Sequence, residues 1–313
     1  MKTLAELKKY YQSDLLPDLE VLEQQRKKII NNLSKTAVPV ILIALVLMLL
    51  FRNAVVFIAI FSVVGLGIAY NYLIRDYVFN FKREIIKKII KSIDAGLTYQ
   101  QSMHISEQLF RESKIFSRRP DRFKGDDFVS GLLGKTKIEF SEIYAQYVTR
   151  DSKGRTTYHT IFKGLFIAAD FNKEFKSTTV VLPDTAEKLF GNFGTMLQSW
   201  NKTRGQLIKL EDPEFEKLFA VYGNDQIEAR YVLSTSLMKR VVDFKNKTGK
   251  KIYLSFVRSK IFVAISYHKD LFEPKVFSTV LSFTPIKEYF ENLRLAVDIV
   301  EDLNLNTRIW GKT

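Results

Sequence analysis

The chain contains no cysteine and only three histidines. The absence of cysteine excludes disulfide frameworks, thiolate nucleophiles and cysteine metal sites together, and it agrees with a reducing compartment. His104, His159 and His268 lie far apart in the sequence. None of them has the i, i+4 spacing with a glutamate that a helical zinc site uses. The sequence therefore predicts neither a metal site nor a cofactor.

Two common catalytic motifs are also missing. No Gly-x-Ser-x-Gly elbow occurs. Gly134, Lys135 and Thr136 resemble the end of a Walker A phosphate-binding loop, but the first glycine of that motif would fall on Val129. The residues after Thr136 alternate like a strand, whereas a helix should follow there to receive the phosphates. The sequence does not favour a nucleotide site.

The chain does have two uncharged apolar runs near its N-terminus, residues 36–51 and 54–74, separated only by Arg52 and Asn53. At 1.5 Å per residue the second run is about 30 Å long as a helix, which matches the hydrocarbon core of a bilayer. The first run is shorter and needs tilt, or help from Leu33 and Ser34. We predict a transmembrane helical hairpin, with a hairpin that dips into the bilayer without crossing as the alternative. The polar-rich residues 1–35 argue against a signal peptide.

Basic residues flank the hairpin on both sides, whereas the connecting turn carries only Arg52. Lys and Arg near the ends of a span are retained on the cytoplasmic side. We therefore expect both termini in the cytoplasm. The basic residues before the hairpin are Arg26, Lys27, Lys28 and Lys35. Those after it, which we expect to contact the membrane surface, are Arg75, Lys82, Arg83, Lys87, Lys88 and Lys91.

These features divide the chain into four predicted parts: an N-terminal cytosolic helical tail (1–35), the transmembrane hairpin (36–75), a basic juxtamembrane helix with a linker (76–100), and a cytosolic α+β domain (101–313). In the tail, Pro17 suits a first helical turn. Arg26 interrupts an apolar seam formed by Leu19, Leu22, Ile29 and Leu33. The juxtamembrane helix, which Gly96 should end, has an apolar face formed by Phe81, Ile85, Ile86, Ile89, Ile90 and Ile93. The two helices either pack as an antiparallel pair, which we favour, or the second lies along the lipid headgroups.

The soluble part alternates strand and helix signals. Period-2 patterns predict strands at 138–147, with a slip that suggests a bulge, and at 156–170, joined by a turn at 151–154. Further strands are expected at 178–182, 251–257 and 261–266, and helical segments at 184–200. Asp212 and Ser234 are expected to cap helices, and a long helix is expected from Thr284 to Leu303. This order is typical of an α+β fold with a largely antiparallel sheet.

The net charge of +14 requires an explanation. Juxtamembrane attraction to anionic lipid accounts for it at about 1 kcal/mol per basic residue near the surface. Nucleic-acid binding would need a basic stripe with exposed aromatics or a known module, and we find none. We therefore expect no nucleic-acid partner. A second basic cluster is predicted to form a solvated or membrane-facing surface; it consists of Arg111, Lys114, Arg118, Arg119, Arg122 and Lys124.

Three groups of neighbouring carboxylates could in principle support acid–base chemistry: Asp126 with Asp127, Glu211 with Asp212, and Asp225 with Glu228. We expect local roles for them instead, such as helix capping by Asp212. An enzyme acting on a lipid or envelope precursor remains the alternative function. Its acid, base or charge-stabilising groups would come from His159, Lys163, Asp212, Asp225 and Glu228, and it would require them to converge in one pocket.

Four stretches resemble the bacterial family called domain of unknown function 3137. They are KGRTTYHTIFKGLFIAADFNK at 153–173, RGQLIKLEDPEFEKLFAVYGNDQIEARYVLS at 204–234, SYHKDLFEPKVF at 266–277 and VEDLNLNTRIW at 300–310. The resemblance covers nearly the whole chain, including the hairpin. It implies no catalytic residue, cofactor or substrate. Some relatives are encoded near small LemA-like membrane proteins, so the resemblance implies a membrane protein of that kind as a partner.

Together these patterns predict a membrane-anchored cytosolic binding or assembly module that engages another membrane-associated protein. The motivation is the lack of a catalytic constellation in a basic, aromatic-rich chain held beside a bilayer, where tethering raises the effective concentration of partners. Direct recognition of anionic lipid by the basic surfaces is a further alternative.

Overall fold

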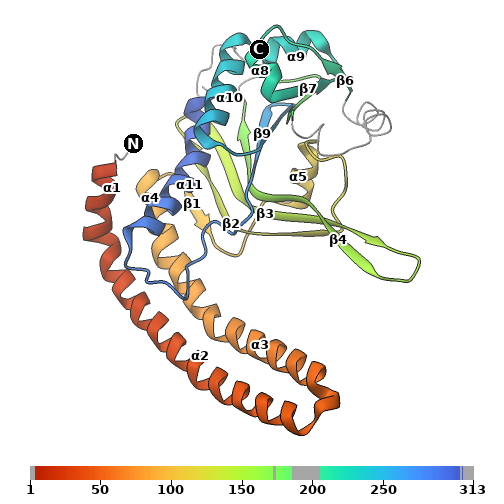
Figure 1. Cartoon of the computed structure of the whole chain (residues 1–313). Helices are drawn as coiled ribbons and strands as arrows, with labels where there is room; N and C mark the ends of the chain where they lie inside the picture. The colour runs from red at the N-terminus through yellow and green to blue at the C-terminus, as the bar shows by residue number, and fades with distance from the viewer. Residues whose placement is uncertain (1–3, 172–173, 185–204, 304, 306–313) are drawn as a thin grey trace. The chain divides into compact units, whose positions relative to one another are not determined.

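The computed structural model describes residues 4–171, 174–184, 205–303 and 305 (Figure 1). They form two compact units. The first contains Met1–Ile93 and Phe272–Glu291, and the second contains Asp94–Leu271 and Asn292–Thr313. The helical segments predicted at 184–200 lie almost entirely outside the described residues, which resume at residue 205.

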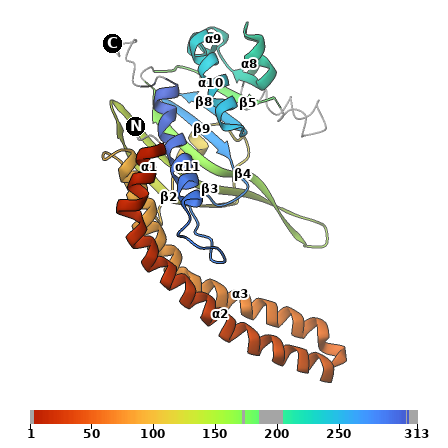
Figure 2. The same cartoon turned by 60° about the vertical axis from the view of Figure 1, so that its left-hand side comes forward.

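The first unit is built on the two apolar runs. Its elements are α1 (Leu4–Tyr10), the π-helical turn η1 (Tyr11–Leu15), α2 (Leu16–Leu50), the 3-10 turn η2 (Arg52–Ala54), α3 (Val55–Phe81), the π-helical turn η3 (Lys82–Ile86) and α4 (Lys87–Ile93). Pro17 stands in the first turn of α2, as predicted. Helices α2 and α3 run side by side as an antiparallel pair (Figures 1 and 2). Both are long and apolar enough to cross a membrane.

Beyond the apolar runs, the two arms of the hairpin continue to pack against each other. Leu19 and Leu22 of α2 are buried, and so are Ile85, Ile86, Ile89 and Ile90 of η3 and α4. Polar contacts join the same arms: Asn80 donates to Gln25 at 3.4 Å, and Lys88 forms an ion pair with Asp18. The prediction that the tail and the juxtamembrane helix pack as an antiparallel pair is therefore confirmed. A juxtamembrane helix lying along the headgroups would instead have its apolar face turned to the lipid.

A later segment of the chain completes this unit. Residues 272–282 lead into α11 (Phe283–Asp302), and we call them the strap. Lys82 is 2% exposed and its Nζ lies 2.7 Å from a carboxylate oxygen of Glu273. Tyr70 stacks on Phe277 with ring centroids 6.0 Å apart. The strap thus provides a carboxylate partner for Lys82 and an aromatic partner for Tyr70. Local periodicity in the sequence does not predict such contacts.

The second unit is organised on a nine-stranded antiparallel sheet in the order β1-β2-β3-β4-β9-β8-β5-β7-β6. The strands are β1 (Thr98–Gln100), β2 (Arg122–Leu133), β3 (Thr136–Arg150), β4 (Thr156–Asp170), β5 (Thr178–Pro183), β6 (Gln206–Ile208), β7 (Phe219–Gly223), β8 (Ile252–Val257) and β9 (Lys260–Ser266). The helices are α5 (Glu107–Glu112), α8 (Pro213–Leu218), α9 (Gln226–Val232), α10 (Thr235–Thr248) and the end of α11. The α+β fold with a largely antiparallel sheet is confirmed.

Capping residues fix the helix ends where the sequence places them. The Asp212 carboxylate accepts hydrogen bonds from the backbone N–H groups of Glu214 and Phe215, which begins α8. Ser234 caps α10 through Leu237, and Gly249 ends that helix at φ 63°. Each cap satisfies backbone groups that the helix itself leaves unpaired. These predictions are confirmed because capping depends on neighbouring residues only.

The bulge predicted in the strand at 138–147 is confirmed as an irregularity of pairing, but the extra residues lie in the partner strands and not in β3 itself. From Ile138 to Ala145, β3 pairs with β4 without interruption. Beyond Ala145 the register shifts, because Gln146 pairs with Thr160 and leaves Ile161 of β4 as an extra residue. A second extra residue lies in β2, between Asp126 and Val129. The apolar phase of β3 changes because different faces are buried along its length: Ile138 and Phe140 point to one face, and Ile143 and Ala145 to the other. A sheet covered on both faces permits this change without an insertion.

The face that carries Ile143 and Ala145 packs on an aromatic core. Phe110 of α5 lies at its centre, 5.0 Å from Phe166 and 5.1 Å from Phe116 between ring centroids. The sequence pattern did not predict α5 or the strands β1, β2 and β7. Residues 98–100, expected in a linker, form the edge strand β1 beside β2. This edge positions the site described next.

Candidate functional site

A β-bulge in β2 brings two adjacent aspartates to one side of the sheet. Asp126 pairs with Glu142 and Val129 pairs with Phe140, so that Asp127 and Phe128 stand opposite the single residue between them on β3. Asp127 adopts φ 56°, a left-handed conformation that aspartate tolerates better than most residues. The backbone N–H of Asp127 donates to the carbonyl of Gln101 at 2.9 Å. Bulges of this kind turn side chains in new directions beside functional sites.

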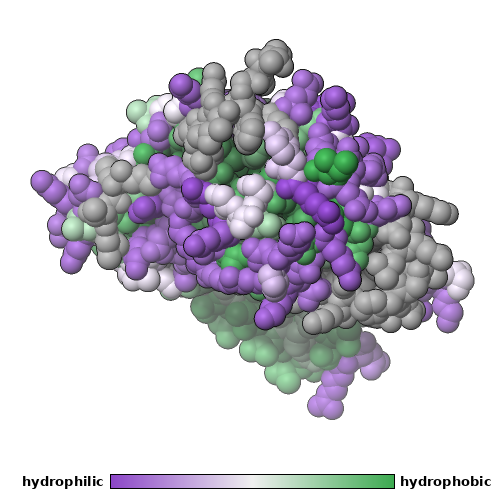
Figure 3. Space-filling view, turned by 90° about the horizontal axis from the view of Figure 1, so that it is seen from above, coloured by the Kyte–Doolittle hydropathy of each residue, from purple (hydrophilic) through white to green (hydrophobic). Residues whose placement is uncertain are grey.

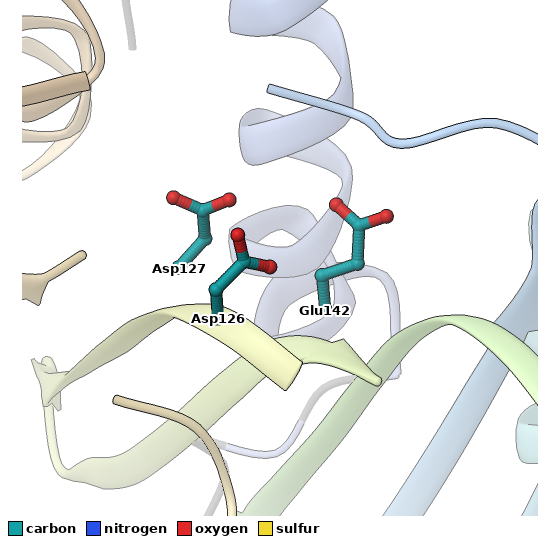
Figure 4. A group of neighbouring side chains, drawn as sticks. All are labelled: Asp126, Asp127 and Glu142. Carbon is teal, nitrogen blue, oxygen red and sulfur yellow. The ribbon is translucent and has the colours of Figure 1, made fainter. Parts of the chain in front are cut away.

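Glu142 of β3 completes the cluster. One oxygen from each of Asp126, Asp127 and Glu142 lies within 4.8 Å of the other two (Figure 4). Glu142 is 6% exposed, and its Oε2 accepts a hydrogen bond from the backbone N–H of Leu271 at 3.0 Å. Its Oε1 is buried without a hydrogen-bond partner among the residues that the structure describes. The Tyr99 hydroxyl donates to Asp127 Oδ1 from β1. We call Asp126, Asp127 and Glu142 the carboxylate cluster.

The cluster adjoins an open cavity of about 200 Å³. Besides Asp126 and Glu142, the cavity is lined by Lys124, Tyr144, Lys163 and Asp270, together with Gly125 and Ile143. The Lys163 ammonium lies 2.8 Å from an oxygen of Asp270. Within this group two lysines stand against four carboxylates, counting Asp127, so acidic groups predominate.

The surroundings of Glu142 oppose its ionisation. Burial raises the pKa of Glu142 to about 8; the hydrogen bond from Leu271 opposes this shift, and the charges of Asp126, Asp127 and Asp270 add to it. The hydrogen bond to Asp270 raises the pKa of Lys163, with a smaller contribution from Glu142. Like charges directly opposite each other on paired strands destabilise a sheet. A fold that places Glu142 across from Asp126 therefore tolerates a locally unfavourable arrangement, as functional sites often do.

The residues predicted for an enzyme do not converge. Asp212 and Asp225 cap α8 and α9. Glu228 accepts hydrogen bonds from the backbone N–H groups of Lys176 and Ser177, at 2.9 and 2.6 Å. His159 stacks on Tyr147 at 4.6 Å and contacts the Thr149 hydroxyl. Of the five, only Lys163 lines the cavity.

Sequence reasoning missed the carboxylate cluster, although one signal was available. Glu142 follows Ile138 and Phe140 at even spacing, on a face where the pattern leads one to expect another apolar residue. The local roles predicted for Asp212 and Asp225 are confirmed, because both residues cap helices. Asp126 and Asp127 instead form a group with Glu142 of the neighbouring strand. The register between β2 and β3 creates this neighbourhood.

The basic residues after the hairpin and those of the second basic cluster differ in exposure and in their partners. After the hairpin, Arg75, Arg83, Lys87 and Lys91 are exposed, whereas Lys82 is buried against Glu273. Lys82 is thus shielded from solvent within its own unit. In the second basic cluster, the Arg118 guanidinium lies 3.7 Å from the centre of the Tyr147 ring and that of Arg122 lies 4.1 Å from Tyr158. These contacts with half-buried Tyr147 and exposed Tyr158 order the arginines without removing their charge.

Comparisons with known proteins support a family assignment for part of the chain. Residues 160–305 match the model of the family described as "Protein of unknown function (DUF3137)". The match confirms the resemblance over these residues. The match begins within β4, so the hairpin and the carboxylate cluster lie outside the matched residues. The comparison with curated proteins found no match.

Among solved structures, the chain is similar to the crystal structure of the mycobacterial trehalose monomycolate transport factor A, TtfA. The two are 13% identical, with a TM-score of 0.33, over 69% of this chain and 95% of that chain. A similarity of this size supports no inference about function.

Proposed function

We propose that this protein is a membrane-anchored binding module. Its hairpin crosses the bacterial inner membrane, both termini lie in the cytoplasm, and its α+β domain engages another membrane-associated protein. The observation that carries the proposal is the exposure of the apolar side chains along α2 and α3. In the most apolar windows of these helices, 6% and 0% of the residues are buried within the protein.

That exposure distinguishes the hairpin from a pair of core helices. Leu49 is 76% exposed, Phe61 74% and Val63 70%. Figure 3 shows the contrast between a surface rich in hydrophilic side chains and a separate region that is largely hydrophobic. Each Å² of apolar surface left in water costs about 25 cal/mol. Two adjacent helices of this kind are therefore best solvated by hydrocarbon, which leaves their backbone groups satisfied internally.

Basic residues next to the spans support the orientation and the membrane contact. Exposed Arg75 lies in α3 just beyond its apolar run, and exposed Arg83, Lys87 and Lys91 lie in η3 and α4. In our proposal these four lie near anionic headgroups, each contributing about 1 kcal/mol. Half-exposed Lys88 pairs with Asp18. We leave Lys82 out of the headgroup contact because Glu273 already neutralises it in a buried pair.

An apolar patch in the second unit supports a protein partner. Ile227 is 83% exposed and Tyr231, four residues later on α9, is 49% exposed. This spacing places both side chains on one face of the helix. Arg230 donates to the carbonyl of Lys209 at 3.3 Å, which places α9 beside the residue that follows β6. Within β6, Leu207 is 44% exposed. Large exposed apolar side chains that gather in this way are typical of protein-binding surfaces.

Site-specific photo-crosslinking in native membranes tests this proposal. A benzophenone amino acid replaces Ile227 or Tyr231 in the full-length protein, and Ser152, in the exposed turn between β3 and β4, provides the control position. We expect one membrane-associated protein to be recovered from both α9 positions and to be absent from position 152. A LemA-like protein, as the family resemblance implies, would identify the partner further. Failure to recover a reproducible partner from positions 227 and 231 contradicts the proposal.

A further inference from the structure

We propose that Asp126, Asp127 and Glu142 bind a hard divalent cation, for which Ca²⁺ is the probe. This inference goes beyond the proposed function and does not depend on it. It rests on the positions of three carboxylates and on one buried oxygen atom that has no partner in the described part of the chain.

The spacing of the carboxylates suits calcium. Oxygen ligands lie 2.3–2.6 Å from Ca²⁺, so two ligands of one ion are separated by at most about 5 Å. The three ligand oxygens of the cluster, all within 4.8 Å of one another, meet this limit without rearrangement. Mg²⁺ holds its ligands at 2.0–2.1 Å, so its ligands lie at most about 4.2 Å apart, and the upper limit of 4.8 Å on the cluster oxygens is compatible with this ion as well. Carboxylate oxygens without a histidine or thiol favour hard ions of this class over zinc or copper.

Burial and charge give the cluster a reason to bind a cation. Glu142 Oε1 is buried, and the described residues offer it no hydrogen bond. Its nearest cross-strand neighbour on β2 is another carboxylate, Asp126. Figure 4 shows the three carboxyl groups on the same side of the two strands. A cation between them would satisfy Oε1 and would attract all three carboxylates.

The residues around the cluster hold it in a suitable geometry. The Tyr99 hydroxyl binds Asp127 Oδ1, and the Leu271 N–H binds Glu142 Oε2. The bulge fixes the backbone of Asp127 through its hydrogen bond to Gln101. Partners of this kind orient the ligands of metal sites before the ion arrives. The adjoining cavity, open to solvent, gives an ion access and leaves room for water ligands.

Lys124 and Lys163 provide the competing explanation, because both residues line the same cavity, and Lys163 is the one with a close carboxylate partner among the described residues. In the structure the Lys163 ammonium pairs with Asp270 at 2.8 Å, and Asp270 lies outside the cluster. Lys163 is therefore committed to a different carboxylate. If Lys124 or Lys163 instead neutralised the cluster, the protein would bind no divalent ion, and this is one outcome of the experiment.

Calcium binding to the full-length protein in detergent micelles tests the inference, measured by isothermal titration calorimetry and by terbium luminescence. Tyr99 and Tyr144 adjoin the cluster and can sensitise bound Tb³⁺, which Ca²⁺ should then displace. We expect saturable binding of one Ca²⁺ per chain. Glu142→Gln and Asp127→Asn should each weaken binding at least tenfold, whereas Asp243→Asn, which changes an exposed carboxylate of α10, should leave it unchanged.

Thermal unfolding in the presence of a chelator distinguishes lost binding from misfolding. The variants should unfold cooperatively near the wild-type temperature, and added Ca²⁺ should raise that temperature in the wild type and Asp243→Asn only. If Glu142→Gln does not fold, Asp126→Asn replaces it as a test of the same cluster. Absence of saturable Ca²⁺ or Mn²⁺ binding to the wild type, or equal affinity in the cluster variants, would overturn the inference.

Discussion

Arg26 donates two hydrogen bonds to Glu23, from Nε to Oε2 at 2.8 Å and from NH2 to Oε1 at 2.6 Å. Both side chains are buried in the first unit. The strap satisfies the remaining groups, because Arg26 NH1 donates to the carbonyl of Val276 and the N–H of Val280 donates to Glu23. The arginine that interrupts the apolar seam of the tail is thus the group that attaches the strap to α2.

Replacing Glu23 by glutamine should destabilise the first unit by about 3 kcal/mol, because the buried Arg26 loses its counter-charge. The hydrogen bonds from Arg26 lower the pKa of Glu23 to about 2, and burial opposes this shift. A lowered carboxyl pKa adds stability above the unfolded value of 4.5, and this stability is lost as the pH falls toward 2. The difference between wild type and Glu23→Gln in thermal unfolding should therefore shrink from pH 7 to pH 3.

Exposed Glu20 on the same helix provides the control. Glu20→Gln should change the unfolding temperature little at either pH. A difference between wild type and Glu23→Gln that stays constant between pH 7 and pH 3 would contradict the role given to the Glu23 carboxylate.

Gly164→Ala should destabilise the second unit by roughly 3 kcal/mol or more. Gly164 has φ 147°, and a Cβ there would lie 2.1 Å from the carbonyl oxygen of Ile265, in the paired strand β9. Gly154, in the turn between β3 and β4, also has positive φ but open space around it. Gly154→Ala should therefore cost only about 1–2 kcal/mol, the cost of the left-handed conformation. Chemical denaturation of both variants measures the difference, and equal losses would contradict this interpretation.

Asp212→Ala should lower stability by about 1 kcal/mol, the usual effect of losing an N-cap. Asp212→Asn keeps an oxygen that can accept from Glu214 and Phe215, so it should retain most of the wild-type stability. Thermal unfolding compares the two variants. If Asp212→Asn is as destabilised as Asp212→Ala, the carboxylate has a role beyond capping.

The comparison of sequence and structure separates local from long-range information. The apolar runs, the caps at Asp212 and Ser234 and the strand 156–170 were predicted correctly, because each depends on neighbouring residues. Strand β2 was missed because Gly125 and the bulge at Asp127 break its alternation. Strand β7 was missed because it begins at Phe219, directly after α8, with no turn residue between the two elements.

Long-range features could not be read in the same way. The carboxylate cluster depends on the register that places Asp126 opposite Glu142, and the attachment of the strap depends on residues some 250 positions apart in the chain. The sequence contains weak traces of both: a glutamate within an apolar strand pattern, and an arginine within an apolar helix seam. A charged residue at a position where the periodic pattern predicts an apolar one therefore indicates a buried long-range polar contact.

The central claim is that α2 and α3 form a hairpin that crosses the membrane, and cysteine accessibility tests it most directly. Because the chain has no cysteine, Asn53→Cys in the hairpin turn and Ser152→Cys in the second unit each introduce a single thiol. In intact cells made permeable in the outer membrane only, a membrane-impermeant maleimide should label position 53. Position 152 should be labelled only after the inner membrane is opened. Labelling of both positions from the same side would contradict the account.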